Sequence, residues 1–329
     1  MFSTVHMFSK STLSPGMLGA ISALVATFFF SLNDSSIKFL SSGYALHQIV
    51  LIRSIVALVL LMVVIVPLDG GFKVLRTQRL GMHLIRGFCV VFANITFFLG
   101  LSVLPLADAV AVFFISPLII TALSVLILRE QVGPRRWMAV FAGLIGVLIM
   151  VRPGTEDFRI ALFLPMIAAF AYAFLHILTR KIGGTESAAT MSVYIQITFI
   201  VVSGLVGLSL GHGQYVGQGD PMFDFLLRGW AWPAEPRDWG ILFLLGITSA
   251  LGGFFISQAY RLAEASVIAP LEYTAMPIAI FFGVVIFGEW PEPLSWLGMS
   301  LIIGAGLFIF WRESLQGRSK GVARPRTRR

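Results

Sequence analysis

The chain is poor in charged residues and nearly free of cysteine. Asp, Glu, Lys and Arg make up 12% of its 329 residues, whereas soluble domains carry about 25%. Cys89 is the only cysteine, which excludes a disulfide framework and a cysteine-based metal site. The five histidines form no pair on one helix face, and no GxSxG, CxxC or phosphate-loop motif occurs. We therefore expect no catalytic residue, no metal, no cofactor and no ATP-driven step within this chain.

Apolar residues dominate instead and predict an all-α integral membrane protein. They account for 57% of the chain, and the mean hydropathy is +0.89. A helix of about 20 apolar residues can cross a bilayer. Ten such spans are predicted, at 17–40, 46–67, 82–103, 107–128, 135–151, 160–180, 188–210, 239–260, 266–287 and 295–311. A short segment, 1–16, precedes them, and the longest polar interruption, 211–238, is expected to be an external loop.

The distribution of Lys and Arg predicts the orientation of these spans, because cytoplasmic segments retain basic residues. With the N-terminus in the cytoplasm, 17 of these residues fall on cytoplasmic segments and 5 on the opposite side. Both termini are therefore expected in the cytoplasm, and the protein in the inner (cytoplasmic) membrane. The basic tail, 312–329, is expected to contact anionic lipid of the membrane rather than nucleic acid.

Two stretches share one spacing and indicate an internal repeat. In REQVGPRRW and GEWPEPLSW, Glu130 and Glu289 are each followed by Pro four residues later and by Trp seven residues later. Each glutamate also follows a proline, Pro117 or Pro277, in the preceding apolar run. Five spans per copy would insert the second copy in the opposite direction. The pattern therefore predicts two inverted five-helix repeats, 17–152 and 160–311, an architecture typical of carriers with a site at the membrane midplane.

The same residues resemble the drug/metabolite transporter superfamily, in particular its EamA-type ten-helix branch. The similarity rests on LPLADA at 104–109, Ser116-Pro117, Glu130, the Gly-rich fifth span, Arg152-Pro153-Gly154 and, more loosely, APLEYTAMP in the second half. The resemblance implies a secondary transporter that moves a small-molecule substrate by alternating access, nearest to bacterial S-adenosylmethionine-type and riboflavin-type carriers. Riboflavin, S-adenosylmethionine and amino acids or related compounds are the candidate substrates. An exporter of drugs or toxic metabolites is the alternative, an intramembrane enzyme is a more remote one, and a homodimer stays open.

Charged residues inside the apolar runs are candidate site residues, because each costs about 3 kcal/mol at bilayer depth unless it is paired or hydrated. Asn33 and Asp34 lie in the outer third of the first span, and Arg53 lies at similar depth in the second. We expect Asp34 and Arg53 to form a carboxylate–guanidinium pair that lines a substrate cavity. A structural clasp between the first two helices is the alternative, and Lys38 is a competing partner of Asp34.

Further candidates lie within other spans, Asn94 and Gln196 near the middle and His176 close to the inner end of the sixth span. Glu272, with Tyr273 beside it, is the main candidate in the second repeat for binding a cation or a proton, and its alternative role is to pair with Arg86. Asn94 and Gln196 are expected to bind substrate, whereas His176 is expected to make a hydrogen bond between helices.

The repeated residues at helix ends have a different expected role. Glu130 and Glu289 lie too close to the membrane surface to reach a substrate at the midplane. With Pro117 and Pro277 they are expected to act as hinge or cap residues, because a glutamate at a helix start complements the helix dipole.

Overall fold

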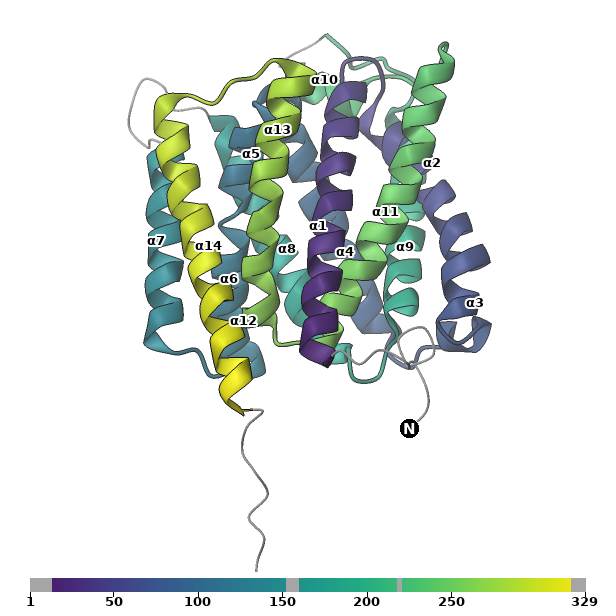
Figure 1. Ribbon diagram of the computed structural model, residues 1–329. Coiled ribbons are helices and arrows are strands. Elements are labelled where there is room, and N and C mark those ends of the chain that lie inside the picture. The colour runs from purple at the N-terminus through teal and green to yellow at the C-terminus, as the bar shows by residue number, and fades with distance from the viewer. Residues whose placement is uncertain (1–13, 152–159, 218–220, 321–329) are drawn as a thin grey trace, which may run out of the picture.

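The computed structural model describes residues 14–151, 160–217 and 221–320, and within these ranges every regular element is a helix (Figure 1). The predicted all-α class is therefore confirmed for these residues. Most of the predicted segment 1–16, the basic residues Arg152 and Arg159, and the end of the basic tail lie outside the described residues. The helices are α1 (Pro15–Leu40), α2 (Leu46–Leu60), α3 (Val66–Leu68), α4 (Leu80–Val103), α5 (Leu106–Phe113), α6 (Ser116–Leu123), α7 (Pro134–Val151), α8 (Phe163–Ile182), α9 (Ala188–Leu210), α10 (Pro221–Leu227), α11 (Pro236–Leu262), α12 (Ala265–Ile268), α13 (Ala275–Phe287) and α14 (Pro293–Lys320).

Short irregular helices connect or extend several of these elements. The turns η1 (Leu61–Ile65) and η3 (Ser124–Leu128) are π-helical, and η2 (Phe72–Leu75), η4 (Ile160–Leu162) and η5 (Ala269–Thr274) are 3₁₀-helical. The predicted external loop contains α10, and α11 starts at Pro236, three residues earlier than expected. Proline fits this first turn because its missing N–H would have no partner there.

Eight helical segments of the described chain are long and apolar enough to cross a membrane. They are Pro15–Leu40, Leu46–Leu68, Leu80–Val103, Leu106–Leu128, Ile160–Ile182, Ala188–Leu210, Pro236–Leu262 and Ala265–Phe287. The predicted fifth and tenth spans coincide with shorter apolar helices, Trp137–Met150 within α7 and Pro293–Ala305 within α14.

The helices form one bundle in which the two halves of the chain interleave. Helix α1 packs against α11, α4 against α8, and α7 against α14, so that each of these contacts joins the first half to the second. We call the end of the bundle at which α1 begins and α14 ends the terminal end (Figure 1). The opposite end, which carries Tyr44 between α1 and α2, is the loop end. There the Tyr44 hydroxyl donates to Asp238, and this bond raises the pKa of Tyr44 to about 12.

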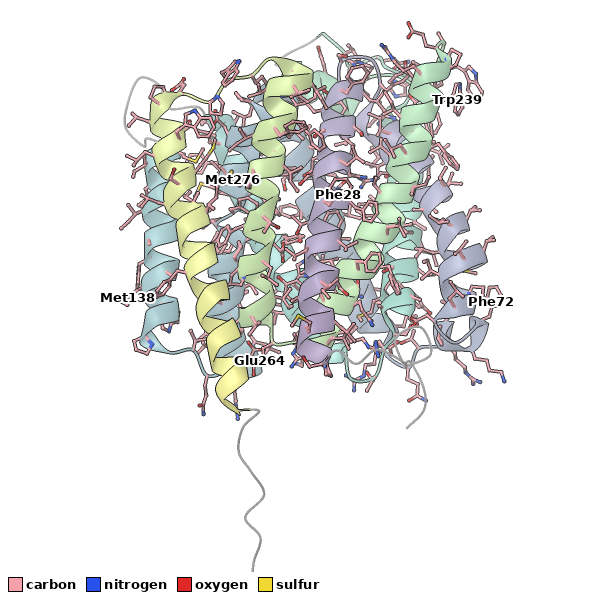
Figure 2. All side chains as sticks on the ribbon, viewed as in Figure 1. Phe28, Phe72, Met138, Trp239, Glu264 and Met276 are labelled. Carbon is pink, nitrogen blue, oxygen red and sulfur yellow. The ribbon has the colours of Figure 1, made fainter. Side chains whose placement is uncertain are left out.

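Apolar side chains cover the outside of the bundle and polar side chains lie within it. Phe28, Phe72 and Met138 point outwards with 49–61% of their surface exposed (Figure 2). Arg53 and Arg86, by contrast, are almost fully buried. Water would oppose so large an apolar surface, whereas lipid accepts it. The chain is therefore a multi-pass membrane protein.

Two spans are irregular at matching places in the two halves. The fourth span breaks at Phe114, between α5 and α6, just before Pro117. The ninth span is 3₁₀-helical over Ala269–Thr274, just before Pro277. Proline lacks the N–H that would bond to the carbonyl four residues earlier, and its ring clashes with that carbonyl. The two breaks meet in the bundle, since the rings of Phe114 and Tyr273 lie edge to face with centroids 5.3 Å apart.

Glycines allow α7 and α14 to approach closely. A Cβ atom on Gly146 would lie 2.6 Å from the carbonyl oxygen of Gly298 and 2.9 Å from Ile302. A small residue is thus required at this crossing.

We expect Gly146→Ala to lower the thermal midpoint of the detergent-purified protein, by a loss of stability of about 1–3 kcal/mol from overpacking. Gly204→Ala is the matched control, because a Cβ on Gly204 in α9 would meet no atom within 4 Å. The control should be neutral or slightly stabilising, since alanine favours a helix. Equal midpoints for the two variants would contradict the tight crossing.

Candidate functional site

A cavity of about 160 Å³ lies inside the bundle, enclosed by α1, α2, α4, α5, α8, α9 and α11. Both halves of the chain therefore contribute to its wall. Its aromatic lining consists of Phe30, Phe97, Phe98, Phe113, Tyr172 and Phe199, and its polar lining includes Asn33, Asp34, Arg53, Arg86, Asn94, His176, Thr179, Gln196, Ser249 and Ser257. Five of the seven residues predicted to bind substrate are thus gathered around one space.

Arg53 links three helices at the cavity wall. Its Nη1 donates to Oδ1 of Asn33 at 2.9 Å, and its Nη2 donates to Oδ1 of Asn94 at 3.0 Å. The Asn33 amide nitrogen in turn donates to Oγ1 of Thr248 at 3.0 Å. The guanidinium also lies over the ring of Phe199, 5.0 Å from its centroid, which adds a cation–π attraction. This cluster fixes α1, α2 and α4 relative to one another.

Asp34 does not form the predicted direct pair with Arg53. Within the described parts of the chain, no side chain hydrogen-bonds or ion-pairs with its carboxylate, and the two asparagine amides occupy the guanidinium instead. The amide oxygens accept from Nη1 and Nη2 of Arg53 without the desolvation of a second charge. Asp34 is half-buried and lines the cavity, so its oxygens are available to a ligand.

Several polar atoms at the cavity have no hydrogen-bond partner within the described chain. They are Oε1 of Gln196, Nε of Arg53 and both ring nitrogens of His176. The His176 ring stacks on Tyr260 and contacts Tyr172 edge to face, each with centroids 4.2 Å apart. Buried polar groups normally have partners, so an unpaired group at a cavity indicates a position for water or a ligand.

His176 was not expected in the site. The predicted hydrogen bond between helices is not among its described contacts, because rings rather than polar groups surround it. Its position on the face of α8 that also carries Tyr172 and Thr179 lines the cavity. Tyr172, His176 and Thr179 are four and three residues apart, which is the spacing of one helix face. The sequence could therefore have predicted that His176 lines the same cavity as its neighbours.

Glu272 lies behind the cavity wall rather than in it. Its carboxylate accepts hydrogen bonds from the hydroxyls of Tyr172, at 2.8 Å, and Tyr260. No Lys or Arg of the described chain lies at ion-pair distance, and Arg86, its alternative partner, donates to Thr179 at 3.0 Å. Tyr273 also lies outside the cavity lining, packed on Phe114.

Glu130 and Glu289, the two glutamates of the repeated motif, lie at opposite ends of the bundle. Glu130 accepts from the backbone N–H groups of Ala265 and Ser266, and Glu289 accepts from that of Leu106. Each glutamate thus caps the start of a helix in the other half, not the helix that follows it in sequence.

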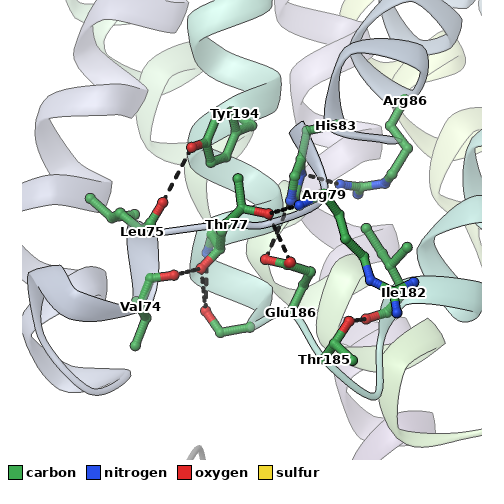
Figure 3. A network of polar contacts seen from close by, with 12 residues as sticks. Val74, Leu75, Thr77, Arg79, His83, Arg86, Ile182, Thr185, Glu186 and Tyr194 are labelled. Atoms are coloured by element: carbon green, nitrogen blue, oxygen red, sulfur yellow. Dashed lines mark hydrogen bonds and ion pairs between the residues drawn. The ribbon is translucent and has the colours of Figure 1, made fainter. Parts of the chain in front are cut away.

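A polar network lies at the terminal end of the bundle, where α4 and α9 begin (Figure 3). Glu186 accepts from Oγ1 of Thr77 at 2.8 Å and lies 3.4 Å from Nε2 of His83. The His83 ring stacks on Tyr194 at 4.5 Å. Arg86 belongs both to this network and to the cavity lining, since its Nη1 lies 3.5 Å from Nδ1 of His83.

Comparison with known sequences identifies the class of this bundle. Residues 17–152 and 159–311 each match the model of the EamA-like transporter family. The chain is 29% identical to a riboflavin transporter of Vibrio cholerae serotype O1, over 93% of this chain and 97% of the relative. It is also 29% identical to an S-adenosylmethionine uptake transporter of Rickettsia prowazekii, over 88% and 91%. A pseudopaline exporter of Pseudomonas aeruginosa is 25% identical over 87% and 94%.

A solved crystal structure has a similar fold, with a TM-score of 0.66 over 92% of this chain and 98% of the other, at 16% identity. The two family matches together cover most of the chain. The chain belongs to the EamA-like transporter family, as the repeated motif predicts. It is a membrane transporter and not an enzyme.

Arg53 provides a test of the cluster at the cavity wall. Asn94→Leu removes the acceptor of Nη2 with little change in volume, and we expect a loss of stability of about 1–3 kcal/mol from the unpaired buried donor. Asn94→Asp, the matched control, keeps an acceptor oxygen and should retain the thermal midpoint more fully. The opposite order of midpoints in detergent would contradict the described hydrogen bond.

Proposed function

We propose that this protein carries a planar, nitrogen-containing metabolite across the inner membrane by alternating access, with riboflavin and S-adenosylmethionine as the leading candidates. The single observation that carries the proposal is the cavity between the two halves, with aromatic walls and unpaired polar atoms. Aromatic side chains stack on planar ligands. A cavity enclosed by both halves of a repeat is also the usual position of a transporter site.

The polar lining suggests how such a ligand would be recognised. Gln196 Oε1 can accept a hydrogen bond from a ring N–H, and the two unpaired ring nitrogens of His176 can also bind polar groups of a ligand. Asp34 would bind a positive group or a further donor. S-adenosylmethionine carries a sulfonium cation and riboflavin carries none, so Asp34→Asn should impair transport of S-adenosylmethionine more than transport of riboflavin.

The topology that this proposal requires has ten spans in two inverted repeats, with both termini in the cytoplasm. The shorter apolar helices Trp137–Met150 within α7 and Pro293–Ala305 within α14 would then be the fifth and tenth spans. The excess of 17 over 5 basic residues supports the orientation. In this orientation the terminal end faces the cytoplasm. The basic tail would then meet anionic lipid of the cytoplasmic leaflet, and a homodimer stays a prediction.

Export is the second candidate direction. The similarity to a pseudopaline exporter supports it, since that relative matches 87% of the chain and the S-adenosylmethionine uptake transporter matches 88%. A cavity between the two halves serves either direction, because the gradients of substrate and coupling ion decide net flux.

Glu272 is the residue we assign to coupling. Its carboxylate is held by two tyrosine hydroxyls, and Tyr172 separates it from the cavity that contains Asp34 and His176. A buried carboxylate without a cation partner is costly when ionised. Proton uptake by Glu272 would therefore affect Tyr172, and through it the substrate position.

Transport by purified protein in liposomes tests the substrate class. We expect saturable uptake of radiolabelled riboflavin or S-adenosylmethionine, and a decrease of at least about tenfold in Gln196→Leu, the loss expected when a buried hydrogen bond to substrate is removed. Asp34→Asn should show the same decrease for a cationic substrate.

Asp224→Asn is the control, since Asp224 bonds to Gly217 outside the bundle interior. Uptake at the wild-type rate by both the Gln196 and the Asp34 variant would contradict the assignment of the cavity as the substrate site. Failure of the wild-type protein to transport either compound would remove the proposed substrate class.

A pH gradient tests the coupling role. We expect Glu272→Gln to transport without any response to an imposed proton gradient while it still exchanges internal for external substrate, because an amide cannot carry the proton. Glu264→Gln, at the surface of the terminal end (Figure 2), is the control and should respond as wild type. An unchanged gradient response in Glu272→Gln would exclude the role.

A further inference from the structure

Two ionic clusters at opposite ends of the bundle are built from equivalent parts of the two repeats. At the loop end, Nζ of Lys38 in α1 lies 2.6 Å and 2.9 Å from the two carboxylate oxygens of Glu289, which follows α13. At the terminal end, Nε of Arg180 in α8 lies 3.8 Å from Oε1 of Glu130, which follows η3. In both clusters the cation comes from the first helix of one half and the glutamate from the fourth span of the other.

The backbone contacts repeat the same plan. Lys38 also donates to the carbonyl oxygen of Leu104 at 2.7 Å, where α4 ends, and Glu289 accepts from the N–H of Leu106, where α5 begins. In the other cluster Arg180 donates to the carbonyl oxygen of Arg261 at 3.1 Å, at the end of α11. Glu130 there accepts from the first N–H groups of α12. Each cation thus binds the end of a third span, and each glutamate binds the start of a fourth span.

The cavity lies between the two clusters, and one helical turn separates it from each. Asp34 lines the cavity and Lys38 follows four residues later on α1. His176 lines the cavity and Arg180 follows four residues later on α8. Residues four apart lie on one face of a helix, so each first helix carries a cavity residue and a cluster residue in line.

An open depression of about 600 Å³ lies on the outer side of the loop-end cluster. Lys38 is part of its lining, together with Phe39, Tyr44, Trp232 and Phe287. Lys38 therefore stands between this outer depression and the inner cavity lined by Asp34.

We propose that Lys38–Glu289 and Arg180–Glu130 are two locks that close opposite ends of the transport path, and that transport opens them one at a time. The inference rests on the proposed alternating access and adds the residues that hold each end closed. Both locks join the two halves of the chain, so neither end can open while its lock is intact. The partners are partly exposed, with 9–30% of their side-chain surface accessible. Water can therefore reach the separated charges, which keeps the cost of opening small.

Thiol accessibility measures which end is open without any knowledge of the substrate. Cys89 is the only cysteine, so Cys89→Ser gives a background without thiols. Ser257→Cys then places one thiol in the cavity lining. A membrane-impermeant maleimide is added from one side in right-side-out vesicles and from the other side in inside-out vesicles.

We expect Glu289→Gln to raise the labelling rate from the loop-end side by about three- to tenfold, the bias expected from losing a partly exposed ion pair, and to lower the rate from the terminal-end side. Glu130→Gln should produce the reverse. Lys38→Gln and Arg180→Gln should behave as the glutamate variant of the same lock does.

Matched controls neutralise a surface carboxylate at each end, Glu235→Gln at the loop end and Glu264→Gln at the terminal end, and should label as the background does. If both lock variants shift labelling to the same side, or match these controls, the proposal is wrong. If Glu289→Gln does not fold, Lys38→Met removes the same ion pair while Glu289 keeps its hydrogen bond from the N–H of Leu106, and it should also raise labelling from the loop-end side. Background labelling of a folded Lys38→Met variant would also overturn the proposal. In a further outcome, the wild-type protein transports neither candidate metabolite while the two glutamate variants shift labelling to opposite sides. That result would support the locks and reject only the proposed substrate class.

Discussion

The cost of a polar group inside a membrane-spanning bundle is the constraint on which the rest of this structure depends. No water is at hand in the hydrocarbon region, so the protein itself must supply the partners. Two asparagine oxygens accept from the terminal nitrogens of Arg53, and two tyrosine hydroxyls donate to Glu272. At the cavity some partners are missing: Oε1 of Gln196 and both ring nitrogens of His176 have no hydrogen-bond partner among the described residues. Paired polar groups therefore hold their helices in place, and the unpaired groups at the cavity can bind water or a ligand.

The repeat organises these groups because contacts between helices run mainly from one half of the chain to the other. Helices α1 and α8 each carry a cavity residue and, one turn further, a cation that binds the opposite half. The irregular segments before Pro117 and Pro277 meet through Phe114 and Tyr273. Broken helices bend more easily than continuous ones. The fourth and ninth spans can thus bend beside the cavity, while ion pairs hold the ends of the bundle.

The sequence predicts where the helices lie along the chain better than which way their side chains face. Apolar runs placed the helices within a few residues, except that α14 continues to Lys320, past the predicted end at 311. Distance along the spans put Asn33, Asp34 and Arg53 in an outer third and Asn94 and Gln196 nearer the middle, and the structure brings all five to one cavity. Depth alone could not show that Arg53 faces two amides or that Tyr172 screens Glu272 from the cavity, since these contacts depend on the rotation of helices far apart in the chain. The repeated Glu-Pro-Trp spacing marked Glu130 and Glu289, but not their partners in the opposite half.

A ligand can shift a conformational equilibrium only through contacts that differ between the two states. Asp34 belongs to the first half and His176 to the second, and each lies one turn from the cation of a different lock. A ligand that touches only one of these residues would act on one lock and leave the other unchanged. A ligand long enough to touch both would connect the two first helices, so that movement of one is passed to the other. Such coupling favours substrates with polar groups at two separated positions around a planar centre, and it disfavours small ions that could occupy the same cavity.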